Sequence, residues 1–259
     1  MSLDTVQQYL FDLQGYLVIE NALSTDEVAA ISAILDEHQL PEEGSRERFG
    51  SAPDGPGFLD WGEPFCNLLD HETIMPILRQ QLGDCFRLDR IYGICMEEGM
   101  HRGALHADYG ATSPFSGVEE GEYYAFKSNQ IYNGFMVVTW NLTDSGPDMG
   151  GFCCIPGSHK SNYKIPRAIF DAPETSPAVV MPHAPAGSVT LFTESLTHGT
   201  AAWRSKAGRR SLLYKYCVSH MAWKSSRVQI PDNVELTERQ EILFGEPGDP
   251  YRYFPSLFA

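Results

Sequence analysis

FRLDRIYGICM, residues 86–96, opens a run of strand-like segments that continues to about residue 219. Val, Ile, Tyr, Phe and Thr are common in this run, and turns that contain Gly and Pro separate its segments. Further strands are expected at 103–108, 131–142, 151–155, 178–182, 187–193 and 209–219. Many short strands after a helical beginning predict a mainly β fold with flanking helices, a jelly roll or double-stranded β-helix of the cupin-like type.

Helices are expected before and after this run. The first contains apolar residues at helical spacing, namely Leu3, Val6, Tyr9, Leu10 and Leu13. Ser24 with Glu27 three residues later is a capping box that starts a second helix. A third helix is expected over about 72–82, and a short one near 237–244 precedes a tail rich in Gly, Pro and aromatic residues.

The chain shows no internal repeat or linker, so a single domain over residues 1–259 is predicted. It would comprise an N-terminal helical preface over about 1–85, a barrel over about 86–220 and a C-terminal packing tail over 221–259. A hydrophobic content of 42% supports a substantial core and argues against disorder.

The chain is acidic, with a formal net charge of −15. Negative charge repels phosphate backbones and anionic lipids, so neither nucleic acid nor a membrane is expected as a partner. No segment offers the roughly 20 apolar residues of a membrane helix, and the N-terminus lacks the pattern of a signal peptide. None of the six cysteines forms a CxxC pair, which leaves a structural zinc site without support. A cytoplasmic location is therefore expected.

His106-Ala107-Asp108 can place two metal ligands on one face of a strand, since side chains at i and i+2 point the same way. An imidazole and a carboxylate so placed are two thirds of a facial triad, the ligand set of non-haem Fe(II) oxygenases. His198, in Thr197-His198-Gly199-Thr200, is the candidate for the third ligand. A tripeptide of this kind is weak evidence alone, and its order with a later histidine and arginine strengthens the prediction.

Arg209 and Arg210 follow on the next expected strand. A guanidinium presents a rigid fork of donors that matches a carboxylate in two parallel hydrogen bonds, which suits the binding of a dicarboxylate cosubstrate. Adjacent strand residues face opposite ways, so only one of the two arginines can point into a barrel. Thr200, two residues after His198, could offer a hydroxyl to the same carboxylate.

These motifs follow one another in a characteristic order. His106-Ala107-Asp108 is followed by a Gly-rich turn that runs into Pro156-Gly157-Ser158-His159-Lys160. His198-Gly199-Thr200 comes next, and Arg209 stands eleven residues after the histidine. In this pattern the chain resembles the phytanoyl-CoA hydroxylase (phytanoyl-CoA dioxygenase) family of Fe(II)- and 2-oxoglutarate-dependent oxygenases, over about residues 10–220.

The resemblance implies a double-stranded β-helix in which His106, Asp108 and His198 hold Fe(II) and leave room for O2. It implies that the cosubstrate 2-oxoglutarate chelates the iron through its keto-acid end. Its far carboxylate would meet Arg209, which the eleven-residue spacing selects, with Thr200 where the family often has a serine. The expected reaction hydroxylates an unactivated C–H bond of a small organic molecule and releases succinate and CO2.

Other interpretations stay open at this point. Desaturation and ring formation share the oxidant with hydroxylation, whereas a carboxylate at Asp108 disfavours a halogenase. The alternative functions are a barrel that binds a metal or small molecule without turnover, and a cupin-type metalloenzyme that does not use 2-oxoglutarate. A loop within 109–130 is expected to lie over the site as a lid, and His159 is expected to have a structural role. The sequence names neither the primary substrate nor the oligomeric state.

Overall fold

The structure is a computed structural model that describes residues 3–38, 40, 48–52, 55–108, 124–161, 163–223, 225–250 and 252–259. Its centre is a six-stranded antiparallel sheet with the strand order β1-β8-β6-β10-β3-β2. The strands of this sheet are β1 (Tyr16–Ile19), β2 (Arg48–Phe49), β3 (Phe86–Met96), β6 (Phe135–Asn141), β8 (Val189–Thr193) and β10 (Arg209–Val218).

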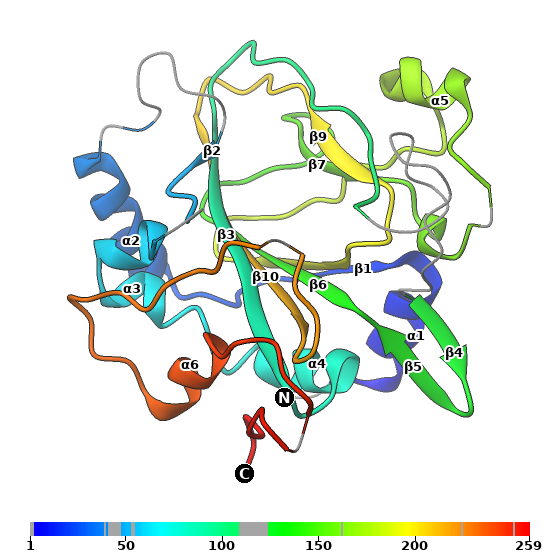
Figure 1. The fold of residues 1–259 in the computed structure, drawn as a ribbon. Helices are drawn as coiled ribbons and strands as arrows, with labels where there is room; N and C mark the ends of the chain where they lie inside the picture. Colours follow the sequence, from blue (N-terminus) through cyan, green and yellow to red (C-terminus); the bar gives the residue numbers. More distant parts are fainter. Residues whose placement is uncertain are drawn as a thin grey trace.

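Two smaller sheets complete the β structure. β7 (Gly151–Cys154) pairs with β9 (His198–Ala201), and β4 (Tyr124–Lys127) pairs with β5 (Gln130–Asn133). Figure 1 shows β7 and β9 above the large sheet and the β4–β5 hairpin projecting at its lower right. Phe152 and Cys154 of β7 belong to the same apolar cluster as Val137 of β6 and Leu213 of β10. The β7–β9 pair thus packs on one face of the large sheet, and the predicted jelly-roll class with flanking helices is confirmed.

Helices cover the opposite face of the large sheet. The helices are α1 (Thr5–Gln14), α2 (Thr25–Glu37), α3 (Glu63–Cys66), α4 (Met75–Leu82), α5 (Arg167–Asp171) and α6 (Glu238–Leu243), with the short 3-10 helices η1 (Gly57–Trp61), η2 (Ser158–Lys160) and η3 (Pro173–Thr175). Residues of α2, α3, α4 and α6 share the main hydrophobic core with the outward side chains of β6, β8 and β10. Figure 1 shows these four helices together on the left and lower sides of the molecule, with α5 apart at the upper right.

The side chains of β10 alternate between the two faces of the large sheet, because successive residues of a strand point in opposite directions. Tyr214 and Tyr216 face the helices, where their hydroxyls donate to the carbonyl oxygens of Phe65 and Leu69 at 2.7 Å each. Burying such a side chain contributes about 1.5–3 kcal/mol. The alternate residues face the interior between the sheets, and these are Arg209, Ser211, Leu213 and Lys215. This alternation decides which polar groups of β10 can reach a site inside the molecule.

The predicted capping box is present. The backbone N–H of Ser24 donates to Oε2 of Glu27 at 2.7 Å, and the N–H of Glu27 donates to Oγ of Ser24 at 3.3 Å. The helix expected over 72–82 begins at Met75, and the one expected near 237–244 is α6. In α1 only Phe11 is buried, and the apolar stripe that predicted this helix lies mostly at the surface.

Three strand predictions need correction. The segment 178–182 contributes only Val180, as a single bridge to Cys154, because nearby prolines supply no N–H for a ladder. The segment 103–108 is likewise no continuous strand, and only His106 forms a bridge. The expected strand 131–142 is divided at Gly134 into β5 and β6. Of the predicted lid over 109–130, residues 109–123 lie outside the described part of the chain, and the remainder forms the β4–β5 hairpin.

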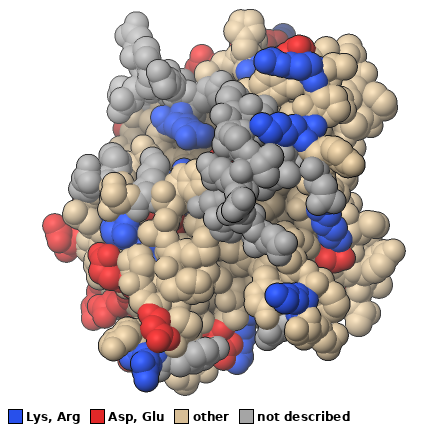
Figure 2. Space-filling view, turned by 45° about the vertical axis from the view of Figure 1, so that its right-hand side comes forward, with Lys and Arg blue, Asp and Glu red and all other residues tan. Residues whose placement is uncertain are grey.

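The described helices include none that is long and apolar enough to cross a membrane. Figure 2 shows one face of the molecule, on which Lys and Arg side chains are separated by neutral and acidic surface. The described part of this face therefore carries no continuous basic patch.

Candidate metal centre

Backbone pairing brings the three predicted ligands together. His106 and His198 form an antiparallel bridge in which each backbone N–H donates to the other residue's carbonyl oxygen at 2.8 Å. Two residues later, the N–H of Asp108 donates to the carbonyl oxygen of Glu194 at 3.2 Å. A Cβ on Gly199 would lie 3.1 Å from a carbonyl oxygen of the facing segment, so glycine permits this close approach. Backbone hydrogen bonds therefore bring the two histidines and the aspartate close together.

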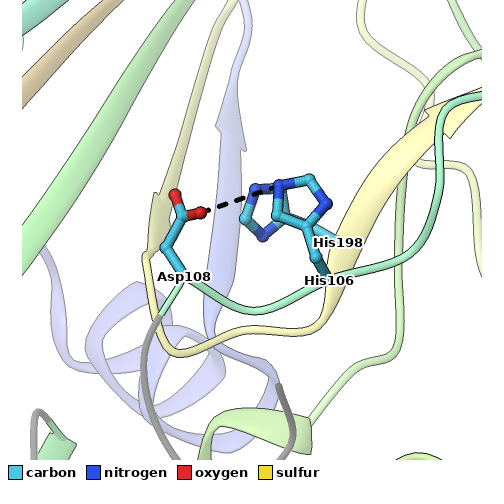
Figure 3. A group of neighbouring side chains, drawn as sticks. All are labelled: His106, Asp108 and His198. Atoms are coloured by element: carbon cyan, nitrogen blue, oxygen red, sulfur yellow. Dashed lines mark ion pairs between the residues drawn. The ribbon is translucent and has the colours of Figure 1, made fainter. Parts of the chain in front are cut away.

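The three side chains converge on a common point. Figure 3 shows His106, Asp108 and His198 turned toward one another. One ligand atom from each lies within 4.8 Å of the other two, and Nε2 of His106 lies 3.9 Å from Oδ1 of Asp108. Adjacent ligands of an octahedral ion at ~2.1 Å stand about 3 Å apart, so modest side-chain rotations would close these groups around one ion. No second cluster of metal-ligating side chains occurs in the described parts of the chain.

Both histidines present Nε2 to that point, because a carbonyl group meets the other ring nitrogen. Nδ1 of His106 lies 2.9 Å from the carbonyl oxygen of Ala104, and Nδ1 of His198 lies 2.7 Å from that of Leu196. A carbonyl oxygen only accepts, so each Nδ1 carries the hydrogen and each Nε2 keeps a lone pair for a metal. Burial, followed by the proximity of His106, lowers the pKa of His198 to about 3 and keeps this imidazole neutral.

Asp108 completes the donor set as a carboxylate anion. Burial by itself would raise the pKa of Asp108, but the ammonium of Lys215, a hydrogen bond with Glu194 and the two histidines outweigh it and hold the pKa well below its usual range. Nζ of Lys215 donates to Oδ2 at 3.0 Å, while Oδ1 is the oxygen nearer His106. Two imidazoles and one carboxylate, arranged together, are the donor set that suits Fe(II) with open coordination positions.

The two neighbouring arginines point in opposite directions. Arg209 lies on the interior face of β10 and is 3% exposed, with Nη1 3.6 Å from Sδ of Met96. A Cβ on Gly151 would lie 3.2 Å from Nε of Arg209, so the Gly-rich turn makes room for this guanidinium. Arg210 faces α2, where its Nη1 lies 2.6 Å from Oδ1 of Asp36. The interior guanidinium is thus that of Arg209, and its role toward a cosubstrate stays a prediction.

Two buried hydroxyls lie on the same interior surface as Arg209. Oγ of Ser211 and Oγ1 of Thr139 have no hydrogen-bond partner within the described chain. A buried polar group left without a partner costs about 1–3 kcal/mol, so this region suits an incoming acceptor such as a carboxylate. Ser211 follows Arg209 at the same-face spacing, a signal that was available in the sequence. Thr139 required knowledge of the pairing between β6 and β10.

The other two predicted positions are also placed. Thr200 is half-buried and stands two residues after His198 on β9, hence on the same face of that strand. His159 is not part of the metal cluster, because its Nε2 lies 3.0 Å from the carbonyl oxygen of Asp12 and its ring meets that of Tyr124 edge-on at 4.6 Å. His159 thus packs η2 against α1.

A model of the phytanoyl-CoA dioxygenase family matches residues 11–211. The chain belongs to this family. Membership confirms the predicted enzyme class, an oxygenase that depends on Fe(II), 2-oxoglutarate and O2. Among curated proteins, none matches the chain.

Solved structures share the fold of this phytanoyl-CoA dioxygenase family member. HygX from Streptomyces hygroscopicus, with nickel and 2-oxoglutarate bound, has a TM-score of 0.72 at 21% identity and covers 92% of this chain and 98% of HygX. HygX with nickel, 2-oxoglutarate and hygromycin B has the same TM-score and identity, over 91% and 98% of the two chains. EctD from S. alaskensis with bound Fe has a TM-score of 0.63 at 19% identity, over 88% and 80%. At these identities the comparison establishes the fold alone.

Proposed function

We propose that this oxygenase hydroxylates an unactivated C–H bond of a small organic molecule, with His106, Asp108 and His198 as the iron ligands. Arg209, with Thr200, would bind the far carboxylate of 2-oxoglutarate. The observation that carries the proposal is the convergence of two Nε2 lone pairs and one carboxylate oxygen within 4.8 Å. HygX, a structural relative, holds hygromycin B in one of its structures, which supports a small molecule as substrate.

Different residues of the chain would bind the metal and the cosubstrate. Bound Fe(II), together with 2-oxoglutarate and O2, supplies an oxidant strong enough for an unactivated C–H bond and yields succinate and CO2. The two histidines and Asp108 bind the metal from one side and leave the other side open. The fork of Arg209 orients a carboxylate in two parallel hydrogen bonds. Ser211 and Thr139 can donate to the same carboxylate, because their buried oxygens have no partner among the described residues. Burial of these groups keeps water away from the bound cosubstrate.

The proposal extends to the cellular location and the domain organisation of the protein. We infer that it works in the cytoplasm as one domain with a helical preface, a barrel and a packing tail. The cysteines support a reducing compartment, because all six are buried as free thiols.

Anaerobic titration tests the proposal most simply. Adding Fe(II) and then 2-oxoglutarate to the protein should produce the visible charge-transfer band of a chelate at an open Fe(II) site, and admitting O2 should release succinate. The absence of the band would refute the assignment. A band without succinate, across a broad set of small molecules, would favour a barrel that binds without turnover.

Two neighbouring variants isolate the cosubstrate contact. R209A should weaken 2-oxoglutarate binding by about 10–100-fold, the loss expected for a charge-assisted bidentate contact. R210A is the matched control, because this arginine faces Asp36 on the other side of the sheet. Equal affinity of wild type and R209A would remove Arg209 from the site and favour a metalloenzyme that does not use 2-oxoglutarate.

A further inference from the structure

A buried ammonium lies against the carboxylate of the proposed metal centre. Nζ of Lys215 is 3.0 Å from Oδ2 of Asp108 and 2.6 Å from Oε1 of Glu194. The side chains of Lys215 and Glu194 are only 4% and 1% exposed. We propose that Lys215, braced by Glu194, is a positioning residue that turns Asp108 so that Oδ1 alone faces the metal. This inference rests on the proposed function.

The two oxygens of Asp108 have different surroundings. Oδ1 lies 3.9 Å from Nε2 of His106, on the side of the metal ligands. Oδ2 accepts the hydrogen bond from Lys215. A carboxylate can bind a metal through one oxygen or both, and occupation of Oδ2 favours binding through Oδ1 alone. Binding through one oxygen keeps a further coordination position open for a chelating cosubstrate.

Glu194 contacts both Asp108 and Lys215 and so holds the two in place. Its carbonyl oxygen accepts the backbone N–H of Asp108 at 3.2 Å, while its side chain meets Lys215. Asp108 follows the His106 bridge, Lys215 belongs to β10 and Glu194 directly follows β8. Three separate segments therefore determine the direction of one carboxylate.

A contribution to fold stability does not by itself explain why Lys215 and Glu194 are buried next to Asp108. Exchanging a buried ion pair for apolar side chains of similar volume is often neutral or stabilising, because removing charges from water is costly. A role in holding one geometry explains why the polar side chains of Lys215 and Glu194 are buried beside a proposed iron ligand. Hydrogen-bond partners of metal ligands act in this way at other metal sites, where their loss weakens metal binding.

Arg90 offers an internal comparison with Lys215. Its Nη2 lies 3.8 Å from Oδ2 of Asp108 and 3.9 Å from Oε1 of Glu194, both beyond hydrogen-bond range. Its guanidinium stacks over the ring of Trp223 at 5.2 Å. Arg90 thus brings positive charge to the same carboxylates without a directed bond. A variant at Arg90 separates a general effect of charge from the specific effect of Lys215.

The test uses the double variant K215M/E194M beside R90M and wild type. The double variant removes Lys215 and Glu194 together, so neither polar group is left buried without the other. The readouts are the anaerobic Fe(II) dissociation constant, the charge-transfer band with 2-oxoglutarate and the melting temperature. We expect K215M/E194M to bind Fe(II) about 10–100-fold more weakly, with a shifted band, at a melting temperature close to that of wild type. R90M should bind Fe(II) as wild type does.

Each other outcome has a definite meaning. Wild-type Fe(II) affinity and an unshifted band in K215M/E194M would overturn the positioning role while leaving the proposed function intact. An equal loss in R90M would overturn it as well, because charge alone would then explain the effect. A wild-type protein that forms no complex with Fe(II) and 2-oxoglutarate would refute both proposals. K215M alone serves if the double variant does not fold, because it removes the donor to Oδ2 of Asp108. It should weaken Fe(II) binding in the same direction, and unchanged binding would refute the positioning role.

Discussion

His106 and His198 are joined by two reciprocal backbone hydrogen bonds, each 2.8 Å long. The main chain, rather than side-chain packing, thus brings together two residues that lie far apart in the sequence. The orientation of each imidazole ring is fixed separately, by a carbonyl oxygen next to its Nδ1. A substitution can therefore remove an imidazole and its Nε2 while the backbone bridge stays in place.

Replacing His106 with alanine should remove metal binding and preserve the fold. The backbone bridge to His198 does not depend on the imidazole, so the melting temperature of the metal-free protein should change little. Fe(II) affinity should fall by about 100-fold or more, since one of three protein ligands is lost. Metal content after anaerobic loading measures the effect, with the exposed His101→Ala as control. Full iron loading of His106→Ala would exclude this residue as a ligand.

Ser211→Ala should separate cosubstrate binding from stability. The hydroxyl of Ser211 is buried without a partner among the described residues, so its removal should leave the free protein as stable as before or slightly more so. If the hydroxyl donates to 2-oxoglutarate, the dissociation constant of the cosubstrate should rise about 2–10-fold, the loss of one ordinary hydrogen bond. Calorimetric titration of the Fe(II)-loaded protein measures it. Unchanged affinity would place the carboxylate away from Ser211.

Gly151→Ala should weaken cosubstrate binding through Arg209. The new Cβ would lie 3.2 Å from Nε of Arg209, and Gly151 has a φ of +101°, which side chains rarely adopt. We expect a loss of stability of about 1–3 kcal/mol and a higher KM for 2-oxoglutarate. Gly55→Ala is the control, because nothing lies within 4 Å of its Cβ position. A stable Gly151→Ala protein with normal KM would contradict the close packing of the turn on this guanidinium.

The sequence predicted those features that depend on local chemistry and on strand period. The capping box at Ser24 follows from two side chains three residues apart, and the opposite facing of Arg209 and Arg210 follows from strand alternation. His106, Asp108 and His198 were recognised because their residue types and order carry the motif. Their convergence in space needed the structure.

Features that depend on pairing between distant segments were missed. β9 was not predicted as a strand, because it is short and lacks a run of β-branched residues. The contact of Lys215 with Glu194 joins β10 to the residue after β8 across the intervening strand β6, and no local pattern encodes that. Thr139 is opposite Leu213 in the β6–β10 pairing, so only the register places its hydroxyl on the interior surface that Arg209 shares.

Stability should fall in mild acid through His159. Burial is the main cause that lowers the pKa of His159 to about 4, whereas the unfolded chain has the ordinary value of about 6.5. Between these values the unfolded chain binds more protons, so the contribution of His159 is complete above about pH 6.5 and is lost as pH falls toward 4. The effect is on the order of 3 kcal/mol.

Urea unfolding of the metal-free protein at pH 7.5 and pH 5 measures this contribution. His159→Gln should show a smaller difference in the free energy of unfolding between the two pH values than wild type does. Other titrating groups, including His198, are common to both proteins and cancel in the comparison. The same pH dependence in the two proteins would rule out His159 as a source of acid sensitivity.

A crystal structure of the protein with Mn(II) in place of Fe(II) and with 2-oxoglutarate is the most direct measurement of the central claim. We predict one anomalous peak, coordinated by Nε2 of His106, Nε2 of His198 and Oδ1 of Asp108, with the far carboxylate of 2-oxoglutarate on Arg209. A metal bound elsewhere, or no peak among these three side chains, would contradict the account.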